Sequence, residues 1–297
     1  MSVFSYICRY LSYTAFFAAV ALPFSARGEL LFRSLELVGG KETWSEARKY
    51  SELADIAFPS RPTSPKVAQQ EVRVSLSGTI QPGDGAGAEI MAALVKSGRH
   101  KISGNQITLA SDGGDMEAAM VIGRLLRKHG IFTRIAEKDQ CMSACVFAFM
   151  GGERRSVAGK LGIHRPYFPH TTDTPDRITR YRVLQRAVRE YVEEMDFPQS
   201  FYEAVMLVPP ESMQFLQAAD LKRFYLEGIS PSSEEAADAA AARRLNLTMV
   251  DYLKLKAAQP GCALAGAIGE RGCTRTAQSV PVLRHAGATA TGASIQP

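Results

Sequence analysis

The chain has 297 residues, of which 46% are hydrophobic and 22% charged, so it can bury a core of normal size without a metal or disulfides to hold it. Its formal net charge of +5 is only mildly basic. Because the arginines are not interleaved with aromatic residues along one element, nucleic acid is not an expected partner. The length fits one large domain or two small ones.

The first 28 residues have the pattern of an export signal. Arg9 is the only charge before Arg27, and the uncharged stretch 11–26 is apolar and ends in small residues. This stretch has 16 residues, fewer than the roughly 20 that a membrane-spanning helix needs. We therefore expect residues 1–28 to be a signal peptide of a periplasmic or secreted protein. The alternative is an uncleaved N-terminal membrane anchor.

Export affects the interpretation of the five cysteines, because an oxidising compartment favours disulfides. Cys262 and Cys273 close a short loop rich in glycine and alanine, and we expect them to be paired. Cys141 and Cys145 are four residues apart, a spacing at which a bridge within a helix is strained, so the sequence leaves this pair open. Structural zinc sites do not normally use a C-x3-C spacing, and we predict no metal site.

Residues 29–70 precede the expected core. The first part is partly apolar, and the rest is polar with three prolines between Pro59 and Pro65. We expect a short lead-in helix and then a linker. Trp44, the only tryptophan, offers a side chain that would dock this segment on the core.

Strands and helices alternate from residue 71 to residue 230. Apolar and polar residues alternate over 71–80, as in a half-buried strand, whereas Gly98 and Gly130 follow stretches with helical periodicity. This alternation predicts a layered α/β fold with parallel strands and right-handed crossovers. The expected strands are 71–80, 105–111, 131–137 and a short one within 156–167; the expected helices are 88–98, 116–130, 141–152, 177–195 and 201–208. A turn, a short helix and a closing strand follow in 209–230. Residues 231–260 form a helical extension and 261–297 a partly disordered tail that contains the last two cysteines.

Three features of this region could carry chemistry. Ser143 opens an apolar helix, where free backbone N–H groups stabilise an oxyanion, although serine is also an ordinary N-cap residue. The Gly113–Gly114 pair lets a backbone amide approach a ligand closely, although it also suits a plain turn. His164 ends a short strand and could be the general base for a serine; His170 is the only competing histidine nearby. Each feature alone is more often structural, but together they indicate a site.

The motifs SDGGD at 111–115, CMSAC at 141–145 and GIHRP at 162–166 resemble those of the Clp-protease and crotonase superfamily, and more closely its periplasmic Clp-like proteins. The segment FLQAADLKRFYLEGI at 215–229 resembles the closing segment of that family. The resemblance covers 71–230. It implies a Clp-protease/crotonase-like α/β fold, a repeated ββα-type layered core with a protruding handle helix near 177–195.

The same resemblance implies the site residues. Ser143 would be the nucleophile, His164 the general base, and the backbone N–H groups of Gly114 and Ala144 the oxyanion hole, with no cofactor. The acidic third member of the family's triad falls at 212–214, where this chain has Ser-Met-Gln. The third member here is therefore Glu211, Asp220 or none.

These residues predict an exported serine hydrolase, a peptidase that acts on peptides or unfolded proteins and that could form a homo-oligomer through its handle helix. Because the acid is missing, the alternative is a catalytically inactive Clp-like binding or scaffold protein. A crotonase-type enzyme acting on an acyl thioester is less favoured, since serine and histidine at these positions argue against it. No G-x4-G-K-[ST] loop is present, so any unfoldase would be a separate chain. The arginines between Arg154 and Arg189 fit a solvated helix face better than a binding surface.

Overall fold

The computed structural model describes residues 29–38, 40–53, 69–167 and 176–258, and the chain divides into two compact units, 1–230 and 231–297. The expected signal peptide, the linker prolines, the Cys262–Cys273 pair and the C-terminal tail lie outside the described residues. The strands are β1 (Glu29–Val38), β2 (Lys41–Trp44), β3 (Arg48–Lys49), β4 (Gln70–Ile80), β5 (His100–Gly114), β6 (Phe132–Ile135), β7 (Gln140–Met142), β8 (Arg154–Val157), β9 (Lys160–Ile163), β10 (Gln214–Phe215) and β11 (Gly228–Ile229). The helices are the 3-10 helix η2 (Tyr50–Leu53), α2 (Asp84–Lys96), α3 (Met116–Lys128), α4 (Ala144–Met150), α5 (Asp176–Glu194), α6 (Gln199–Leu207), α7 (Ala218–Arg223), α8 (Pro231–Arg244) and α9 (Met249–Ala258).

Residues 29–38 form strand β1, so the expected lead-in helix was wrong for this segment. β1 pairs antiparallel with β4, and its Leu30 and Phe32 side chains are buried. Burial alternates along β1, with Leu30, Phe32 and Ser34 buried and Arg33 exposed, which is the period of a strand and not of a helix. Trp44 does dock the segment, because the Arg73 guanidinium of β4 lies 4.1 Å from the centre of its ring.

The long strand β5 organises the sheet. It pairs in parallel with β4 and β6, and its Ser111 pairs with Cys141 of β7. Two branches leave β5, one through β7 and β9 to β10, and the other through β6 and β8 to β11. The predicted α/β fold with parallel pairing at its centre is thus confirmed, and the antiparallel pairs lie at its ends.

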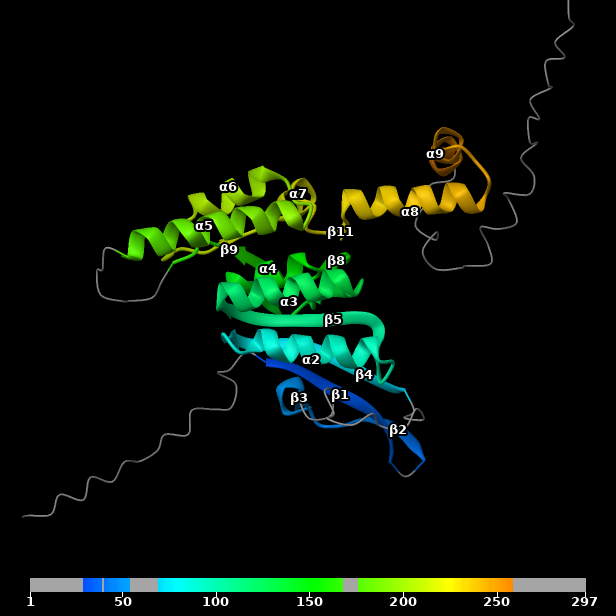
Figure 1. Cartoon of the computed structure of the whole chain (residues 1–297), viewed down its shortest axis with the longest axis horizontal. Helices are drawn as coiled ribbons and strands as arrows, with labels where there is room; N and C mark the ends of the chain where they lie inside the picture. The colour runs from blue at the N-terminus through cyan, green and yellow to red at the C-terminus, as the bar shows by residue number, and fades with distance from the viewer. Residues whose placement is uncertain (1–28, 39, 54–68, 168–175, 259–297) are drawn as a thin grey trace, which may run out of the picture. The chain divides into compact units, whose positions relative to one another are not determined.

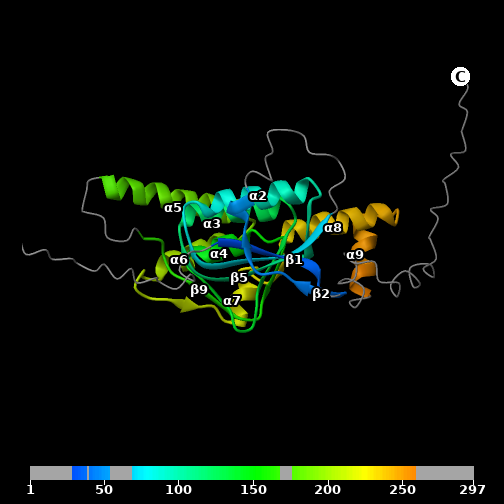
Figure 2. The same cartoon turned by 90° about the horizontal axis from the view of Figure 1, so that it is seen from below.

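Helices α2 and α3 lie side by side (Figures 1 and 2). The predicted helix 116–130 is confirmed with little change: the Asp115 carboxylate accepts the Ala118 N–H at 2.8 Å, and Gly130 ends the helix with φ +61°. The predicted handle helix is α5, whose C-terminal half buries Val188 and Tyr191 and packs beside α6.

The observed bounds of several elements differ from the predicted ones. The helix expected over 141–152 begins only at Ala144, because 140–142 form β7. The strand expected within 156–167 is two strands, β8 and β9. They are joined by a turn at Gly159, where an added Cβ atom would collide with the Ala136 and Asp139 carbonyl oxygens. The Gly113–Gly114 pair, expected as a turn, forms the last two residues of β5.

The described residues of the second unit form two helices, α8 and α9, within the predicted helical extension 231–260. Asn246 has φ +54° and ends α8, and the Thr248 hydroxyl accepts the Asp251 N–H at 3.2 Å to begin α9. The Lys256 ammonium of α9 binds the Asp238 and Glu234 carboxylates of α8 at 2.8 and 2.9 Å, which ties the pair together.

Candidate active site

Ser143 lies at a sharp turn between strand β7 and helix α4. Its backbone has φ +55° and ψ −124°, a combination that L-residues seldom adopt. The Ser143 N–H donates to the Gly162 carbonyl at 2.9 Å, and its own carbonyl accepts the Val146 N–H at 3.1 Å. A strained serine between a strand and a helix is the arrangement known as a nucleophile elbow, which lifts the hydroxyl out of the sheet.

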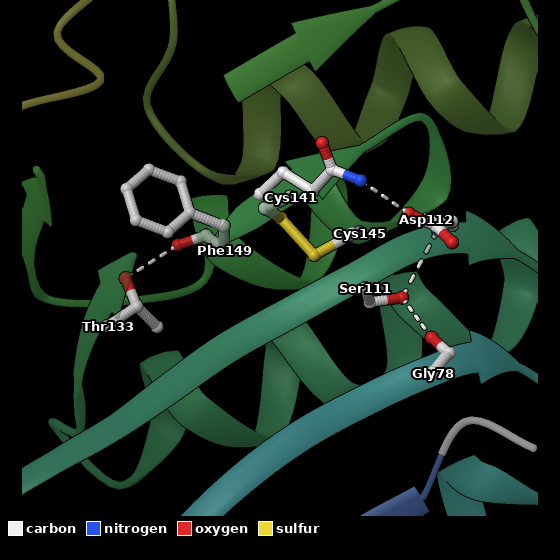
Figure 3. Close-up of a disulfide and its surroundings, with 9 residues drawn as sticks. Gly78, Ser111, Asp112, Thr133, Cys141, Cys145 and Phe149 are labelled. Carbon is white, nitrogen blue, oxygen red and sulfur yellow. Dashed lines mark hydrogen bonds between the residues drawn. A yellow bond between two sulfur atoms is a disulfide. The ribbon is translucent and has the colours of Figure 1, made fainter. Parts of the chain in front are cut away.

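A disulfide joins Cys141 to Cys145 across this turn (Figure 3). The sequence left this pair undecided because a helix would strain the bridge. Cys141 instead belongs to β7 and Cys145 to the first turn of α4, so their Cα atoms lie 5.3 Å apart, within the range of disulfides. Both cysteines are fully buried.

His164 follows the last residue of β9 and is 7% exposed. Its Nδ1 lies 3.0 Å from the Arg165 carbonyl oxygen, which can only accept a hydrogen bond. In a neutral imidazole this contact assigns the proton to Nδ1, which would leave the Nε2 lone pair for a proton from a serine. The Arg165 N–H donates to the Val208 carbonyl at 2.9 Å and fixes the segment against the end of α6.

The strand register aligns no acid with His164. Strand β10 pairs antiparallel with β9, with Gln214 opposite Ile163 as the last pair toward His164. Continuing this register by one residue would align Met213 with His164. The Asp220 carboxylate accepts the Gln217 N–H at 3.0 Å and caps α7. Glu211, the other acid that the sequence offered, is exposed in the turn before β10. Neither acid is therefore paired with His164 in the described strands.

The two glycines that end β5 border the serine. A Cβ on Gly113 would lie 2.7 Å from Ser143 Cβ and 3.0 Å from the Ala144 nitrogen, and a Cβ on Gly114 would collide with the Ile80 carbonyl. Their φ values are +102° and +133°, so both positions need glycine. The Gly113 N–H already donates to Ser111 Oγ at 3.1 Å, and that hydroxyl donates to the Gly78 carbonyl (Figure 3).

One cavity of about 920 Å³ brings the predicted site residues Ser143, His164 and Gly114 to a common surface. Ala144, the fourth predicted residue, follows Ser143 in the chain and is fully buried. Side chains of α3 and α5 form an apolar part of the wall: Met116, Met120, Val183 and Leu184. Sequence reasoning missed this wall, because no local pattern shows that α5 returns to face α3.

In the described ranges, no cluster of three or more histidine, cysteine, aspartate or glutamate side chains could hold a metal ion. Over the same residues, no helix combines the length and apolar character that crossing a membrane requires.

No protein-family model and no curated protein matches this chain. Among solved structures it is similar to the 1510-N membrane-bound stomatin-specific protease, at 15% identity and a TM-score of 0.40, over 52% of this chain and 75% of that one. It is also similar to ClpP1 from Listeria monocytogenes, at 17% identity and a TM-score of 0.39, over 52% of this chain and 86% of that one. Likenesses this distant carry no weight for activity, which has to be judged from the geometry of the site itself.

Proposed function

We propose that this chain is an exported serine hydrolase, a peptidase acting on peptides or unfolded proteins, with Ser143 as nucleophile and His164 as general base. One observation carries the proposal. A serine held at φ +55° between a strand and a helix borders the same cavity as a buried histidine whose Nδ1 is engaged by a carbonyl. Strained backbone of this kind persists where the surrounding structure holds it, and it is concentrated at active sites.

The proposed reaction assigns one step to each of these groups. Ser143 Oγ attacks the substrate carbonyl while His164 Nε2 takes its proton and later returns it to the leaving amine. Ala144 is the first residue of α4, so its N–H has no acceptor within the helix and can donate to the oxyanion. Because the Gly113 N–H is engaged by Ser111, Gly114 is the glycine of the pair that would supply the second donor.

The Arg165 carbonyl takes the place at His164 Nδ1 that an acid holds in a full triad. A carbonyl fixes the tautomer of the imidazole as a carboxylate does. It is neutral, however, and stabilises the imidazolium that forms during the reaction less well. We therefore expect an active but slow enzyme.

Three features support the expected substrate, location and assembly. Gly114 is exposed at the cavity, where an extended peptide could lie along the end of β5. The Cys141–Cys145 disulfide suits an oxidising compartment outside the cytoplasm, as export predicts. Ile178 of α5 is 63% exposed, which supports contact between this helix and a second copy of the chain.

The test is covalent labelling of the purified mature protein with a fluorophosphonate probe. We expect the wild type to be labelled, and Ser143→Ala and His164→Ala to lose the label. Ser156→Ala and His129→Ala are matched controls, since neither residue lines the cavity, and both should be labelled like the wild type. A labelled Ser143→Ala variant would show that another residue reacts and would refute the assignment.

The second candidate is an inactive binding protein with the same cavity, and the non-acidic Met213, which the continued strand register aligns with His164, favours it. A well-folded wild type that takes no label, with the disulfide either intact or reduced, would establish this alternative.

A further inference from the structure

We propose that the Cys141–Cys145 disulfide positions Ser143 for reaction, so that the chain stays unreactive until this bond has formed. The proposal rests on the proposed function, in which Ser143 is the nucleophile. It assigns the two cysteines a role in positioning and none in contact with substrate.

The geometry of the turn gives the first reason. In a nucleophile elbow the chain reverses so sharply that the residues two before and two after the serine approach each other, and the common G-x-S-x-G sequence places glycines there. In this chain those two positions are Cys141 and Cys145, whose Cα atoms lie 5.3 Å apart. The disulfide therefore holds these two residues close together, whereas glycines at the same positions would only allow them to approach.

A competing conformation gives the second reason. The sequence from 141 to 152 has the composition of one continuous helix, in which Ser143 would relax to negative φ. A bridge between residues four apart is strained in such a helix, whereas it fits the observed strand and turn. Without the bond, only the Ser143 N–H to Gly162 and the Val146 N–H to Ser143 hydrogen bonds resist this relaxation.

Global stability does not explain the bond well. A disulfide that closes a loop this short constrains the unfolded chain least. Helix α4 is fixed independently at its far end, since the Thr133 hydroxyl donates to the Phe149 carbonyl at 2.9 Å (Figure 3). The Tyr191 hydroxyl also donates to the Phe147 carbonyl at 2.6 Å. We therefore expect reduction to change the turn at Ser143 while the rest of the unit remains folded.

Burial determines when the bond can change. Both cysteines are fully buried, so dissolved thiols reach them slowly once the chain has folded. The redox state is thus set during folding: the two thiols lose two protons and two electrons to a disulfide-bearing oxidant, which becomes a dithiol. A chain synthesised in a reducing compartment would be inert, and export would activate it.

The experiment compares the mature wild type with the double variants C141A/C145A and C141G/C145G, and with C262A/C273A as the matched control. For each protein, two quantities are measured: the labelling rate at saturating fluorophosphonate and the fluorophosphonate concentration that gives half this rate. Thermal unfolding of each protein is measured in parallel. We expect C141A/C145A to be labelled about tenfold or more slowly at saturation, with half-saturation unchanged because the cavity is preserved. The control should match the wild type.

The glycine variant separates positioning from stability. Glycine is less stable than alanine in a strand or helix but allows the close approach of the elbow. We therefore expect C141G/C145G to unfold at a lower temperature than C141A/C145A and yet to be labelled faster. If the disulfide acted only through stability, the variant with the lower unfolding temperature would also be labelled more slowly.

The outcomes distinguish this inference from the proposed function. If the oxidised wild type is not labelled, the proposed function fails, and this inference with it. If it is labelled and C141A/C145A reacts within about twofold of it, the inference is wrong and the hydrolase stands. Should the alanine variant not fold, wild type refolded with excess dithiol, with its free thiols counted, replaces it; full reactivity of that reduced protein would overturn the inference.

Discussion

Gly113 shows how closely the end of β5 approaches the serine. Replacing it with alanine would place a Cβ 2.7 Å from Ser143 Cβ and 2.8 Å from the Met142 carbonyl, at a φ of +102°. We expect Gly113→Ala to abolish fluorophosphonate labelling and to lower the free energy of unfolding by about 1–3 kcal/mol, because both the elbow and the strand must shift.

Gly104 on the same strand is the matched control for this change. It also has a positive φ, +63°, but a Cβ there would meet no atom within 4 Å. Gly104→Ala should lower the free energy of unfolding by about 1 kcal/mol or more through backbone strain alone and leave labelling intact. Equal labelling of Gly113→Ala and Gly104→Ala would show that Gly113 is not adjacent to the reactive hydroxyl.

The third position of the triad can be tested by adding an acid and by removing one. Met213 aligns with His164 when the register of β9 with β10 is continued by one residue, whereas Glu211 is exposed. We expect Met213→Glu to raise the labelling rate, on the order of tenfold, because a carboxylate stabilises the imidazolium. Glu211→Gln should leave the rate unchanged; a large loss in this variant would make Glu211 the third member after all.

At the scale of elements, the sequence predicted those whose periodicity is strong. Helix α3 was found almost to its bounds, because Asp115 caps its start and Gly130 its end. β1 was missed because a short apolar stretch is ambiguous without its strand partner, β4. The turn at Ser143 was also missed, although the symmetry of CMSAC was a usable signal: two cysteines, each two residues from the serine, require a close approach there.

The N-terminal strands are joined to the core by an aromatic cluster that contains a histidine. The Tyr50 hydroxyl lies 3.1 Å from His100 Nδ1, and Phe32 packs against both rings. Burial, and then the positive charge of Arg48, lowers the pKa of His100 below its usual 6.5. The folded protein therefore favours neutral His100, whose stabilising contribution is complete above pH 6.5 and is lost as the pH falls through the lowered value.

We expect His100→Gln to remove this part of the pH dependence, since glutamine still offers Tyr50 an acceptor. The measurement is the thermal midpoint of both proteins at pH 7.5 and at pH 5. The wild type should lose more stability on acidification than the variant.

Asp84, whose pKa burial raises to about 6, contributes in the opposite direction, because its stabilising effect grows as the pH falls through that value. Asp84 is present in both proteins, so it cancels in the comparison; identical pH dependence would exclude His100 as the sensor.

At the scale of the whole molecule, the sequence predicted an α/β core from 71 to 230 and a helical extension from 231 to 260, and the structure divides into compact units between Ser230 and Pro231. The core extends further toward the N-terminus than expected, because β1 and η2 contribute Leu30, Phe32 and Tyr50 to it. Long-range pairing of this kind has no local signature. The placement of α5 beside α3, which forms part of the cavity wall, has no local signature either.

The division into units predicts what a shortened chain would do. Every buried hydrophobic residue of the described chain except Ala242 lies between Leu30 and Leu226, and so do the residues of the candidate site. Since burial of apolar surface supplies most of the stability, the first unit contains nearly all of it. We expect a mature chain that ends after Ser233 to unfold cooperatively within about 3 °C of the full mature chain and to take fluorophosphonate label at the same rate. Loss of labelling with an unchanged thermal midpoint would instead show that the α8–α9 unit takes part in the reaction.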